Sequence, residues 1–306
     1  MTIHALNRRA FLQTTAAVTA STLLTHGISW AAADHKVENI GVQLYTVRER
    51  MKADFDGSLA KVASIGYKNV ELAEFSFDDA GVHYFGRSPK EVRAALDSHG
   101  LTAVGTHVNY KSLAPENFPK VLEASKVLGH KYIVNPWIEE EDRKQPGIWN
   151  RVAETFNRVG EASKGAGFQF GYHNHWFEFL PVDGKLPYDI LLEKCDPKLV
   201  KMELDLCWIT AAGADPVKYF EKYPGRFPLV HVKDLKKLPE ITTGGPQNFG
   251  DTVDLTEVGS GIIDWKRIFA HSEQAGIKYY IVEHDHPKDA FQSITTSYGY
   301  LKNLRW

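Results

Sequence analysis

Residues 59–72 read LAKVASIGYKNVEL and hold the unit from which the fold of this chain is predicted. Leu59 and Val62 are spaced for one face of an amphipathic helix. Gly66 is expected to end that helix, because glycine accepts the left-handed backbone conformation, and residues 68–72 follow as a short strand. The same order of helix, glycine and β-branched or aromatic run recurs along the chain. The glycines at this position are Gly66, Gly100, Gly129, Gly167, Gly225 and Gly276.

Eight candidate strands result when residues 40–45 and 199–204 are added to the runs that follow these glycines. Eight strands alternating with helices in roughly 250 residues are typical of a (β/α)8 TIM barrel. We therefore predict an α/β fold, a single-domain TIM barrel over residues 34–306. The alternative is an open doubly wound sheet, which usually begins with a glycine-rich phosphate-binding turn. The segment after the first strand, residues 46–49, contains no glycine.

The charge balance gives no indication of a nucleic-acid partner. The chain has 36 Lys and Arg against 38 Asp and Glu, a net charge of -2, with no basic excess. Cys195 and Cys207 are the two cysteines, which is too few for a disulfide scaffold in a chain of this size. Neither belongs to a CxxC pair, so the sequence does not indicate a thiolate zinc site.

The N-terminus has the layout of an export signal. Residues 7–12, Asn-Arg-Arg-Ala-Phe-Leu, precede an apolar run over residues 16–30 and three alanines that end at Ala33. This resembles a twin-arginine signal peptide, so we expect residues 1–33 to be cleaved and the mature chain to be periplasmic. The alternative is a plain membrane anchor. The run is interrupted by polar residues and is short for a span of about 20 apolar residues, so we expect no stable anchor after cleavage.

Carboxylates and imidazoles gather where the last four predicted strands end, which is where TIM barrels carry their chemistry. Such groups must be paired or must bind a metal when they are buried. A mixed set of imidazoles and carboxylates suits Mn, Co, Zn or Mg better than calcium. We predict Asp205, His231 and Glu283 as ligands of one divalent ion. The strand-end segments are residues 172–178, 203–205, 231–234 and 283–286.

The fifth strand offers several candidates for a fourth ligand. Period-two alternation puts His173 and His175 on the same face, toward the barrel mouth, so either of them fits. Glu178 lies beyond the strand and is a further candidate, as ligand or as base. We place His173 first. Asn174 is on the opposite face and is expected to support the ligands.

Residues 34–306 resemble the xylose-isomerase-like TIM barrels, which include sugar-phosphate isomerases and epimerases, ketose 3-epimerases, inosose-pathway enzymes and endonuclease IV. In the ketose 3-epimerases, Glu, Asp, His and Glu from strands 5 to 8 hold one divalent metal. The resemblance implies that Asp205, His231 and Glu283 take the last three of these roles. The stretches that carry it are Glu-Leu-Asp-Leu-Cys-Trp at 203–208, Val-His-Val-Lys-Asp at 230–234 and Ile-Val-Glu-His-Asp at 281–285.

Two positions depart from the epimerase pattern. The strand-5 glutamate falls on His173, and a substrate-contacting histidine three residues after the strand-6 aspartate is replaced by Trp208. The His-Asn-His pattern followed by Glu178 resembles a subgroup of sugar isomerases, and inosose dehydratases and enzymes acting on 3-keto-glycosides are similar at this strand. The resemblance therefore implies the metal site but not the epimerase reaction.

The chemistry that the family implies is proton abstraction beside a carbonyl that the metal polarises, giving an enediolate. Glu283 and Glu178 are the candidate bases, and His175 or His107 is the candidate assistant. Lys233 is a candidate for stabilising the oxyanion, with an ordinary surface lysine as the equal alternative. We expect a sugar isomerase or epimerase, with a keto-sugar lyase, a dehydratase or a 3-keto-glycoside hydrolase on the same site as the alternative.

Two other functions are alternatives to a sugar isomerase, epimerase or lyase. The first is a non-catalytic exported sugar-binding protein, which the intact set Asp205, His231 and Glu283 disfavours. The second is a nuclease like endonuclease IV, which gathers three metals, and the acidic chain and the export signal disfavour it. We expect a sugar or keto-sugar as the ligand and no nucleic acid. A homo-oligomer is left open.

Overall fold

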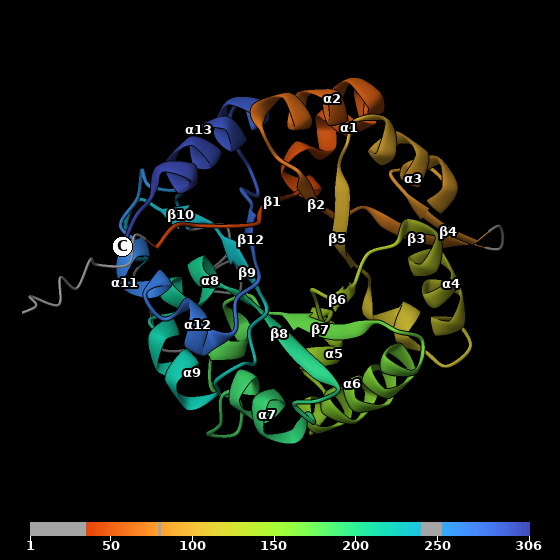
Figure 1. Ribbon diagram of the computed structural model, residues 1–306. Coiled ribbons are helices and arrows are strands. Elements are labelled where there is room, and N and C mark those ends of the chain that lie inside the picture. The colour runs from red at the N-terminus through yellow and green to blue at the C-terminus, as the bar shows by residue number, and fades with distance from the viewer. Residues whose placement is uncertain (1–34, 79–80, 240–252) are drawn as a thin grey trace, which may run out of the picture. The chain divides into compact units, whose positions relative to one another are not determined.

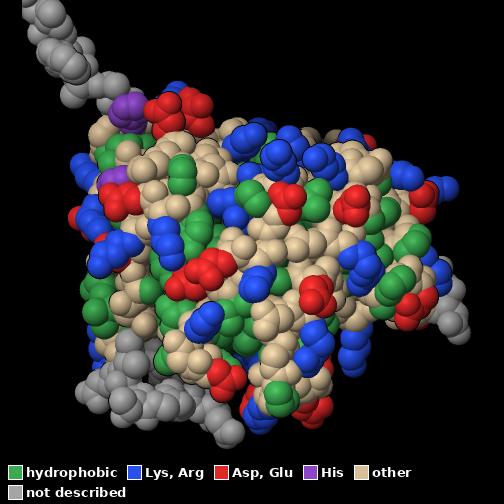
Figure 2. Space-filling model, turned by 90° about the horizontal axis from the view of Figure 1, so that it is seen from below, with side chains coloured by type: hydrophobic (Ala, Val, Ile, Leu, Met, Phe, Trp, Pro, Cys, Tyr) green, Lys and Arg blue, Asp and Glu red, His purple; other side chains and the backbone are tan. Residues whose placement is uncertain are grey.

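A computed structural model describes residues 35–78, 81–239 and 253–306, which belong to one compact unit. The predicted signal peptide, residues 1–33, lies outside the described residues and stays a prediction. Within the described part of the chain, no helix has the length and hydropathy needed to cross a membrane. On the face drawn in Figure 2, basic and acidic side chains are interspersed with hydrophobic and neutral ones.

Parallel strands close into a barrel, which confirms the predicted fold class (Figure 1). The order around the barrel is β1-β12-β9-β8-β7-β6-β5-β2, so strands that follow one another in the chain are neighbours. The barrel strands are β1 (Ile40–Gln43), β2 (Asn69–Leu72), β5 (Thr102–His107), β6 (Tyr132–Asn135), β7 (Gln169–His173), β8 (Val200–Asp205), β9 (Leu229–Val232) and β12 (Tyr279–Val282).

The helices form a ring outside the strands (Figure 1). The α-helices are α1 (Arg48–Ala53), α2 (Phe55–Ile65), α3 (Pro89–Ser98), α4 (Phe118–Leu128), α5 (Glu140–Arg143), α6 (Ile148–Gly165), α7 (Pro187–Lys194), α8 (Leu206–Ala211), α9 (Pro216–Lys222), α11 (Trp265–Phe269), α12 (Ser272–Ala275) and α13 (Ala290–Asn303). Short 3-10 helices are η1 (Leu44–Val47), η2 (Tyr110–Leu113) and η3 (Phe177–Phe179).

Local sequence sets the ends of these helices. Ser88 and Glu91 form a capping box at the start of α3, where they satisfy backbone N–H groups that have no partner within the helix. At the other end, all six glycines of the repeating unit adopt a positive φ, as predicted. Gly66 has a φ of 123°, and a Cβ there would also meet the Tyr298 hydroxyl at 2.7 Å and its ring carbons at 2.8 Å. Glycine is therefore required at this position for two reasons.

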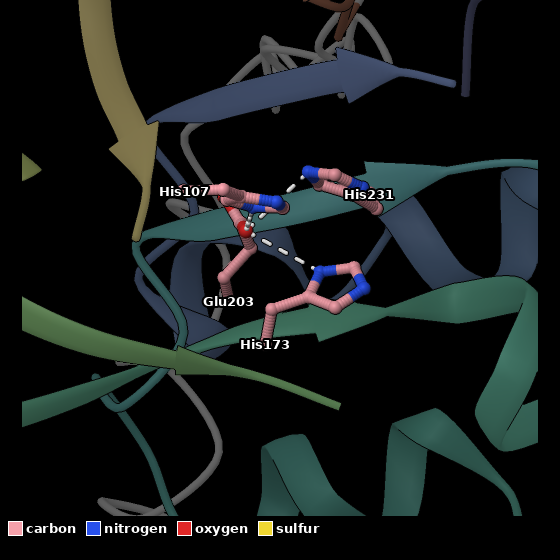
Figure 3. Close-up of side chains that lie close together, drawn as sticks. All are labelled: His107, His173, Glu203 and His231. Atoms are coloured by element: carbon pink, nitrogen blue, oxygen red, sulfur yellow. Dashed lines mark hydrogen bonds and ion pairs between the residues drawn. The ribbon is translucent and has the colours of Figure 1, made fainter. Parts of the chain in front are cut away.

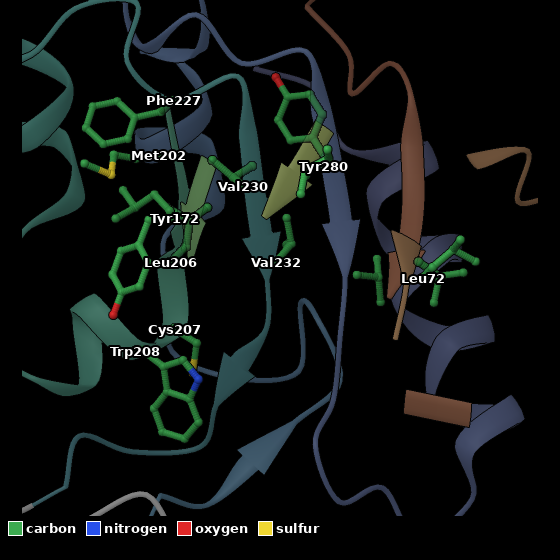
Figure 4. Close-up of a cluster of buried hydrophobic side chains, with 14 of the residues drawn as sticks. Leu72, Tyr172, Met202, Leu206, Cys207, Trp208, Phe227, Val230, Val232 and Tyr280 are labelled. Carbon is green, nitrogen blue, oxygen red and sulfur yellow. The ribbon is translucent and has the colours of Figure 1, made fainter. Parts of the chain in front are cut away.

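Alternate residues of each strand pack outward against the helices and form the main hydrophobic core. Tyr172, Met202 and Val230 are fully buried in this layer between the barrel and its helices (Figure 4). Phe156 of α6 packs on Tyr172 with ring centroids 5.1 Å apart. The opposite set of residues faces the barrel interior. Toward the carboxyl ends of the strands, that interior is polar rather than aliphatic.

Two small antiparallel pairs extend the strand-to-helix connections after β2 and β9. They are β3 (Phe75–Asp78) with β4 (Gly81–Tyr84), and β10 (Asp234–Leu235) with β11 (Leu255–Thr256). The buried Asp234 carboxylate fixes the second connection, because it accepts hydrogen bonds from the N–H groups of Gly259, Gly261 and Ile263. This places residues 253–256 at the C-terminal face of the barrel, where the candidate site lies.

Candidate metal centre and active site

The structure brings together the three ligands predicted from the strand ends. The strand register pairs Asp205 of β8 with His231 of β9, and Glu283 directly follows the neighbouring strand β12. One ligand atom from each lies within 4.8 Å of the others, and all three side chains are buried. Nδ1 of His231 is 2.8 Å from Oε2 of Glu283 and 4.0 Å from Oδ2 of Asp205.

His173 stands beside this group, as expected for a fourth ligand. Its Nε2 is 3.7 Å from Oδ2 of Asp205, and its ring packs edge-on against the His231 ring. Strand β7 ends at His173, so the period-two alternation does not extend to His175. The His175 ring nonetheless lines the cavity above the centre. Of the three strand-5 candidates, His173 is the one that reaches Asp205.

Asp205 is held so that one carboxylate oxygen remains for a cation. Its Oδ1 accepts hydrogen bonds from the backbone N–H groups of Cys207 and Trp208, each at 2.9 Å, and so caps α8. Its own N–H donates to Oδ1 of Asn174, the contact expected of a residue that supports the ligands. Oδ2 is buried and accepts no hydrogen bond of good geometry from the described residues, and its one close cation is the Lys233 ammonium, 3.2 Å away. Such an oxygen beside two imidazoles and a carboxylate fits a divalent ion.

Lys233 belongs to the site, so the alternative of a surface lysine is wrong. Its side chain is 1% exposed, and Nζ lies 3.2 Å from Asp205, 2.8 Å from Glu283 and 3.1 Å from Asp285. Burial opposes the charged form, but these carboxylates raise the pKa of Lys233 well above its ordinary value. The charged Lys233 side chain therefore contacts Asp205 and Glu283, the same carboxylates that are candidate metal ligands.

Two buried glutamates, Glu203 and Glu71, were not predicted as site residues. They lie deeper in the barrel than the candidate metal ligands. Oε2 of Glu203 lies 2.8 Å from Nε2 of His107, 3.3 Å from Nδ1 of His173 and 3.3 Å from Nε2 of His231 (Figure 3). Glu203 is two residues before Asp205 on β8, so it shares the inward face of that strand. The two-residue spacing from Asp205 could therefore have identified Glu203 from the sequence.

Glu71, the second missed residue, orients the ligand His231. Its Oε2 is 2.8 Å from Nε2 of His231 and accepts a hydrogen bond of 2.8 Å from Nε2 of Gln43. Without an ion, Nδ1 of His231 also lies at hydrogen-bond distance from a carboxylate, that of Glu283. An ion that replaced the Nδ1 proton would leave Nε2–H donating to Glu71. A carboxylate that fixes the tautomer of a ligating histidine in this way is a common partner in metal sites.

The deeper layer is a set of opposed charges. Burial alone would lower the pKa of His107, but Glu71 and Glu203 raise it to about 9. Burial and the repulsion from Glu71 together raise the pKa of Glu203 to about 7, against the imidazoles. For Glu71 the attraction of His107 and His231 outweighs the effect of burial, so its pKa is lowered. His107 therefore serves as a cation between two carboxylates, at the edge of the cavity.

Glu178 is not brought together with the other candidates. It is fully buried in η3, where Oε1 accepts the Tyr172 hydroxyl and Oε2 accepts the backbone N–H of His175 at 2.9 Å. It lines neither of the cavities described below. Both oxygens accept hydrogen bonds that hold the turn carrying His175. Glu178 therefore positions His175 and does not face the cavity itself.

We expect the Glu178→Gln substitution to remove a pH dependence of stability. Burial raises the pKa of Glu178 from 4.5 to about 7 in the folded chain. Its stabilising contribution is thus complete below pH 4.5 and is lost as the pH rises to about 7. Relative to the variant, the wild type should lose about 2–3 kcal/mol of unfolding free energy across this range. Urea unfolding at pH 4.5 and pH 7.5 measures this, and a pH-independent difference would contradict the assignment.

A cavity of about 400 Å³ opens above the centre. Its volume lies in the range of small-molecule sites, and it combines aromatic faces with a few converging polar groups. Of the predicted site residues, His107, His173, His175, Lys233 and Glu283 line it. Other lining residues are Tyr45, Glu74, Phe75, Asn109, Trp137, Glu139 and Asp285.

Comparison with known proteins gives the family. The model of the xylose isomerase-like TIM barrel family matches residues 59–304, so the chain belongs to that family. This confirms the resemblance inferred from the strand ends and the expected class of protein, an enzyme with this fold.

Curated relatives are inosose dehydratases. The chain is 29% identical over 138 residues to that of Clostridium tetani, covering 44% of this chain and 46% of the relative. It is 26% identical over 254 residues to that of Geobacillus thermodenitrificans, covering 75% of this chain and 81% of the relative. The chain thus spans about half the length of the first relative and most of the second.

Solved structures of the same fold extend over nearly the whole described chain. A sugar phosphate isomerase/epimerase from Parabacteroides distasonis shares 28% identity with a TM-score of 0.69, covering 88% of this chain and 95% of that one. A xylose isomerase-like TIM barrel protein from Mycobacterium smegmatis, solved in complex with magnesium, shares 11% identity with a TM-score of 0.60. It covers 86% of this chain and 95% of its own, and at that identity it supports the fold alone.

Proposed function

We propose that this chain is a metal-dependent enzyme that removes a proton from the carbon next to a sugar carbonyl. The substrate is a sugar or keto-sugar, and the outcome is isomerisation, epimerisation or loss of water. One observation carries the proposal. Asp205, His231 and Glu283 converge beneath a cavity of about 400 Å³, with one ligand atom of each within 4.8 Å of the others.

The side chains that would hold the ion are His173, Asp205, His231 and Glu283. When bound there, a divalent ion acts as a Lewis acid toward a carbonyl oxygen. Lys233 adds a fixed positive charge on the same side of the cavity, 2.8 Å from Glu283. A cation held by buried carboxylates stabilises negative charge that develops on a substrate oxygen without reorganising at the moment of reaction.

His175 is the residue best suited to accept the proton. Burial and the charge of Lys233 lower the pKa of His175 well below its ordinary value, so its ring is neutral at pH 7. Its Nδ1 has no hydrogen-bond partner among the described residues. We choose His175 for its place at the cavity wall, where a neutral imidazole can accept a proton. Glu283 is assigned to the ion, and Lys233 and His231 outweigh burial and hold its pKa well below the usual range.

Dehydration is the second outcome that the site supports. Curated relatives that match the chain carry the name inosose dehydratase. Removal of the same proton leads to dehydration when the neighbouring carbon bears a hydroxyl that leaves. His107 is a cation at the cavity edge and can protonate such a hydroxyl. Both outcomes share the first step, so one experiment tests the proposal and then separates them.

The test is metal-dependent exchange in deuterated water. The chain loaded with Mn²⁺ or Co²⁺ is incubated with a panel of sugars, keto-sugars and inososes, and the carbon-bound hydrogens are followed by NMR. We expect deuterium to enter beside a carbonyl of at least one substrate, and chelation or His175→Ala to reduce the rate by at least about 100-fold. New stereochemistry in the product indicates an isomerase or epimerase, and an unsaturated product indicates a dehydratase. Exchange that persists in EDTA would rule out the metal-dependent step.

A further inference from the structure

We propose that the active site takes a two-ring substrate, a glycoside whose second ring is a sugar seated in a neighbouring aromatic cavity. This inference rests on the proposed function, because it assumes that the first ring reacts at the metal centre. It adds a binding subsite for a second ring to that function.

The second cavity adjoins the first and is at least as large. Its volume is about 490 Å³, against about 400 Å³ for the cavity above the metal centre. Both are lined by Tyr45, Trp137, His175 and Asp285. These shared residues form the boundary between two parts of one cleft. Each part alone lies in the size range that holds a small organic ligand, so a single monosaccharide leaves one of them without a ligand.

Aromatic rings give the second cavity flat faces suited to a sugar ring. Trp137, Trp176 and Trp208 all line it. The Trp176 and Trp208 ring centroids are 5.1 Å apart, and those of Trp137 and Trp176 are 6.2 Å apart. The rings pack at steep angles to one another, so each indole is held in its orientation by contacts with neighbouring rings. Trp208 is nearly buried and packs against Lys233 and His175. The partly exposed rings of Trp137 and Trp176 are therefore the ones that can take the apolar C–H face of a pyranose.

Polar side chains line the rest of the second cavity, which favours a sugar over a purely apolar ring. Asp254 and Asp285 supply carboxylate oxygens, and His284 and His286 supply imidazoles. Carboxylates accept hydrogen bonds from hydroxyl groups and are among the stronger acceptors. Each carboxylate pairs with a lysine, Asp254 with Lys236 and Asp285 with Lys233, and still has acceptor capacity for a hydroxyl. A ring with several hydroxyls uses both the aromatic faces and these acceptors.

Residues at the boundary are placed to contact the link between the two rings. His175 and Asp285 line both cavities, and His175 is also our candidate for proton transfer. The His175 ring lies 4.7 Å from Trp137 and 6.0 Å from Trp208, measured between ring centroids. A substrate that spans the boundary therefore places its glycosidic oxygen beside the reacting end of the cleft. The turn held by Glu178 fixes this boundary.

The test compares monosaccharides with disaccharides that contain the same reacting sugar. Binding is measured by calorimetry with Mn²⁺ present, using glucose with cellobiose, galactose with lactose, and xylose with xylobiose. We expect at least one disaccharide to bind about tenfold more tightly than its monosaccharide, which corresponds to 1.4 kcal/mol. Trp176→Ala should remove that advantage and leave monosaccharide affinity unchanged, and Trp176→Phe should restore part of it.

A matched control separates loss of the ring from general damage. Trp306→Ala removes an indole that packs against Phe269 and lines neither cavity, so it should change neither affinity. Equal affinities for mono- and disaccharides, or an equal loss of both in Trp176→Ala, would overturn the inference. A gain for 4-nitrophenyl glucoside that exceeds the gain for cellobiose would assign the cavity to an aromatic group instead of a sugar.

The same data distinguish failure of the inference from failure of the proposed function. Deuterium exchange on a monosaccharide without any disaccharide advantage keeps the function and removes the second-ring subsite. A disaccharide advantage that depends on Trp176, without metal-dependent exchange on any ligand, keeps the subsite and removes the proposed reaction. No binding of any sugar overturns both.

Discussion

Replacing Asp205 with asparagine is expected to lower the affinity of the chain for Mn²⁺ or Co²⁺ by at least about 100-fold, the upper end of what losing a supporting partner costs. Oδ2 of Asp205 faces the candidate ligands His231 and Glu283, and its negative charge is what a divalent ion requires. Asparagine retains the Oδ1 acceptor that caps α8 through Cys207 and Trp208. The substitution therefore removes the ligand charge while leaving the local fold. Titration calorimetry on the metal-free protein measures the change.

Asp289→Asn is the matched control for this substitution. Oδ1 of Asp289 caps α13 by accepting the N–H groups of Phe291 and Gln292, which is the same arrangement as at Asp205. It lines neither cavity, so metal affinity should stay at the wild-type value. Equal metal affinity in Asp205→Asn and in the wild type would show that the ion, if it binds, is held elsewhere.

Replacing Lys233 with methionine is expected to lower the unfolding free energy of the metal-free protein by about 3–5 kcal/mol. Its ammonium group lies among the carboxylates of Asp205, Glu283 and Asp285, and removing it takes the nearest cation from buried Asp205 and one of the two cations from Glu283. A divalent ion supplies compensating charge, so saturating Mn²⁺ should restore most of the loss. Urea unfolding with and without Mn²⁺ measures both numbers. Recovery by Mn²⁺ but not by an equal ionic strength of NaCl isolates the specific effect.

Lys201→Met controls for the loss of a barrel lysine that has no carboxylate partner in the metal centre. Lys201 also belongs to the barrel, on β8, but its Nζ donates to the backbone oxygen of Gly225 rather than to a carboxylate. Losing this single hydrogen bond should cost about 1–2 kcal/mol, with no recovery by Mn²⁺. If Lys233→Met were no more destabilising than Lys201→Met, the carboxylates would not depend on Lys233 for compensation.

The repeating sequence unit predicted the fold because it encodes local backbone requirements. Gly66 and Gly129 adopt positive φ values at the ends of α2 and α4, and a glycine at such a position can be recognised without any tertiary information. The candidate ligands could be predicted for a related reason. Asp205, His231 and Glu283 come at the ends of parallel strands, and the carboxyl ends of such strands meet at one face of a barrel.

Residues inside the barrel were harder to predict, because their roles depend on pairing across strands. Glu71 contacts His231, 160 positions away in the chain, and Glu203 contacts His107, 96 positions away. Neither partnership has a local sequence signature. Glu178 was placed at the site from its spacing alone, yet η3 turns its carboxylate back toward Tyr172. Lys233 was ambiguous for the same reason, since only the tertiary structure brings three carboxylates around it.

The most direct test of the metal centre is the number of divalent ions that the wild-type chain binds. We would remove metal with EDTA, titrate Mn²⁺ and Co²⁺ into residues 34–306, and measure bound metal by elemental analysis after dialysis. The ligand set of His173, Asp205, His231 and Glu283 predicts about one ion per chain. No bound ion, with either metal supplied, would contradict the metal-dependent mechanism and favour a sugar-binding role. Three ions per chain would instead favour a site of the nuclease kind.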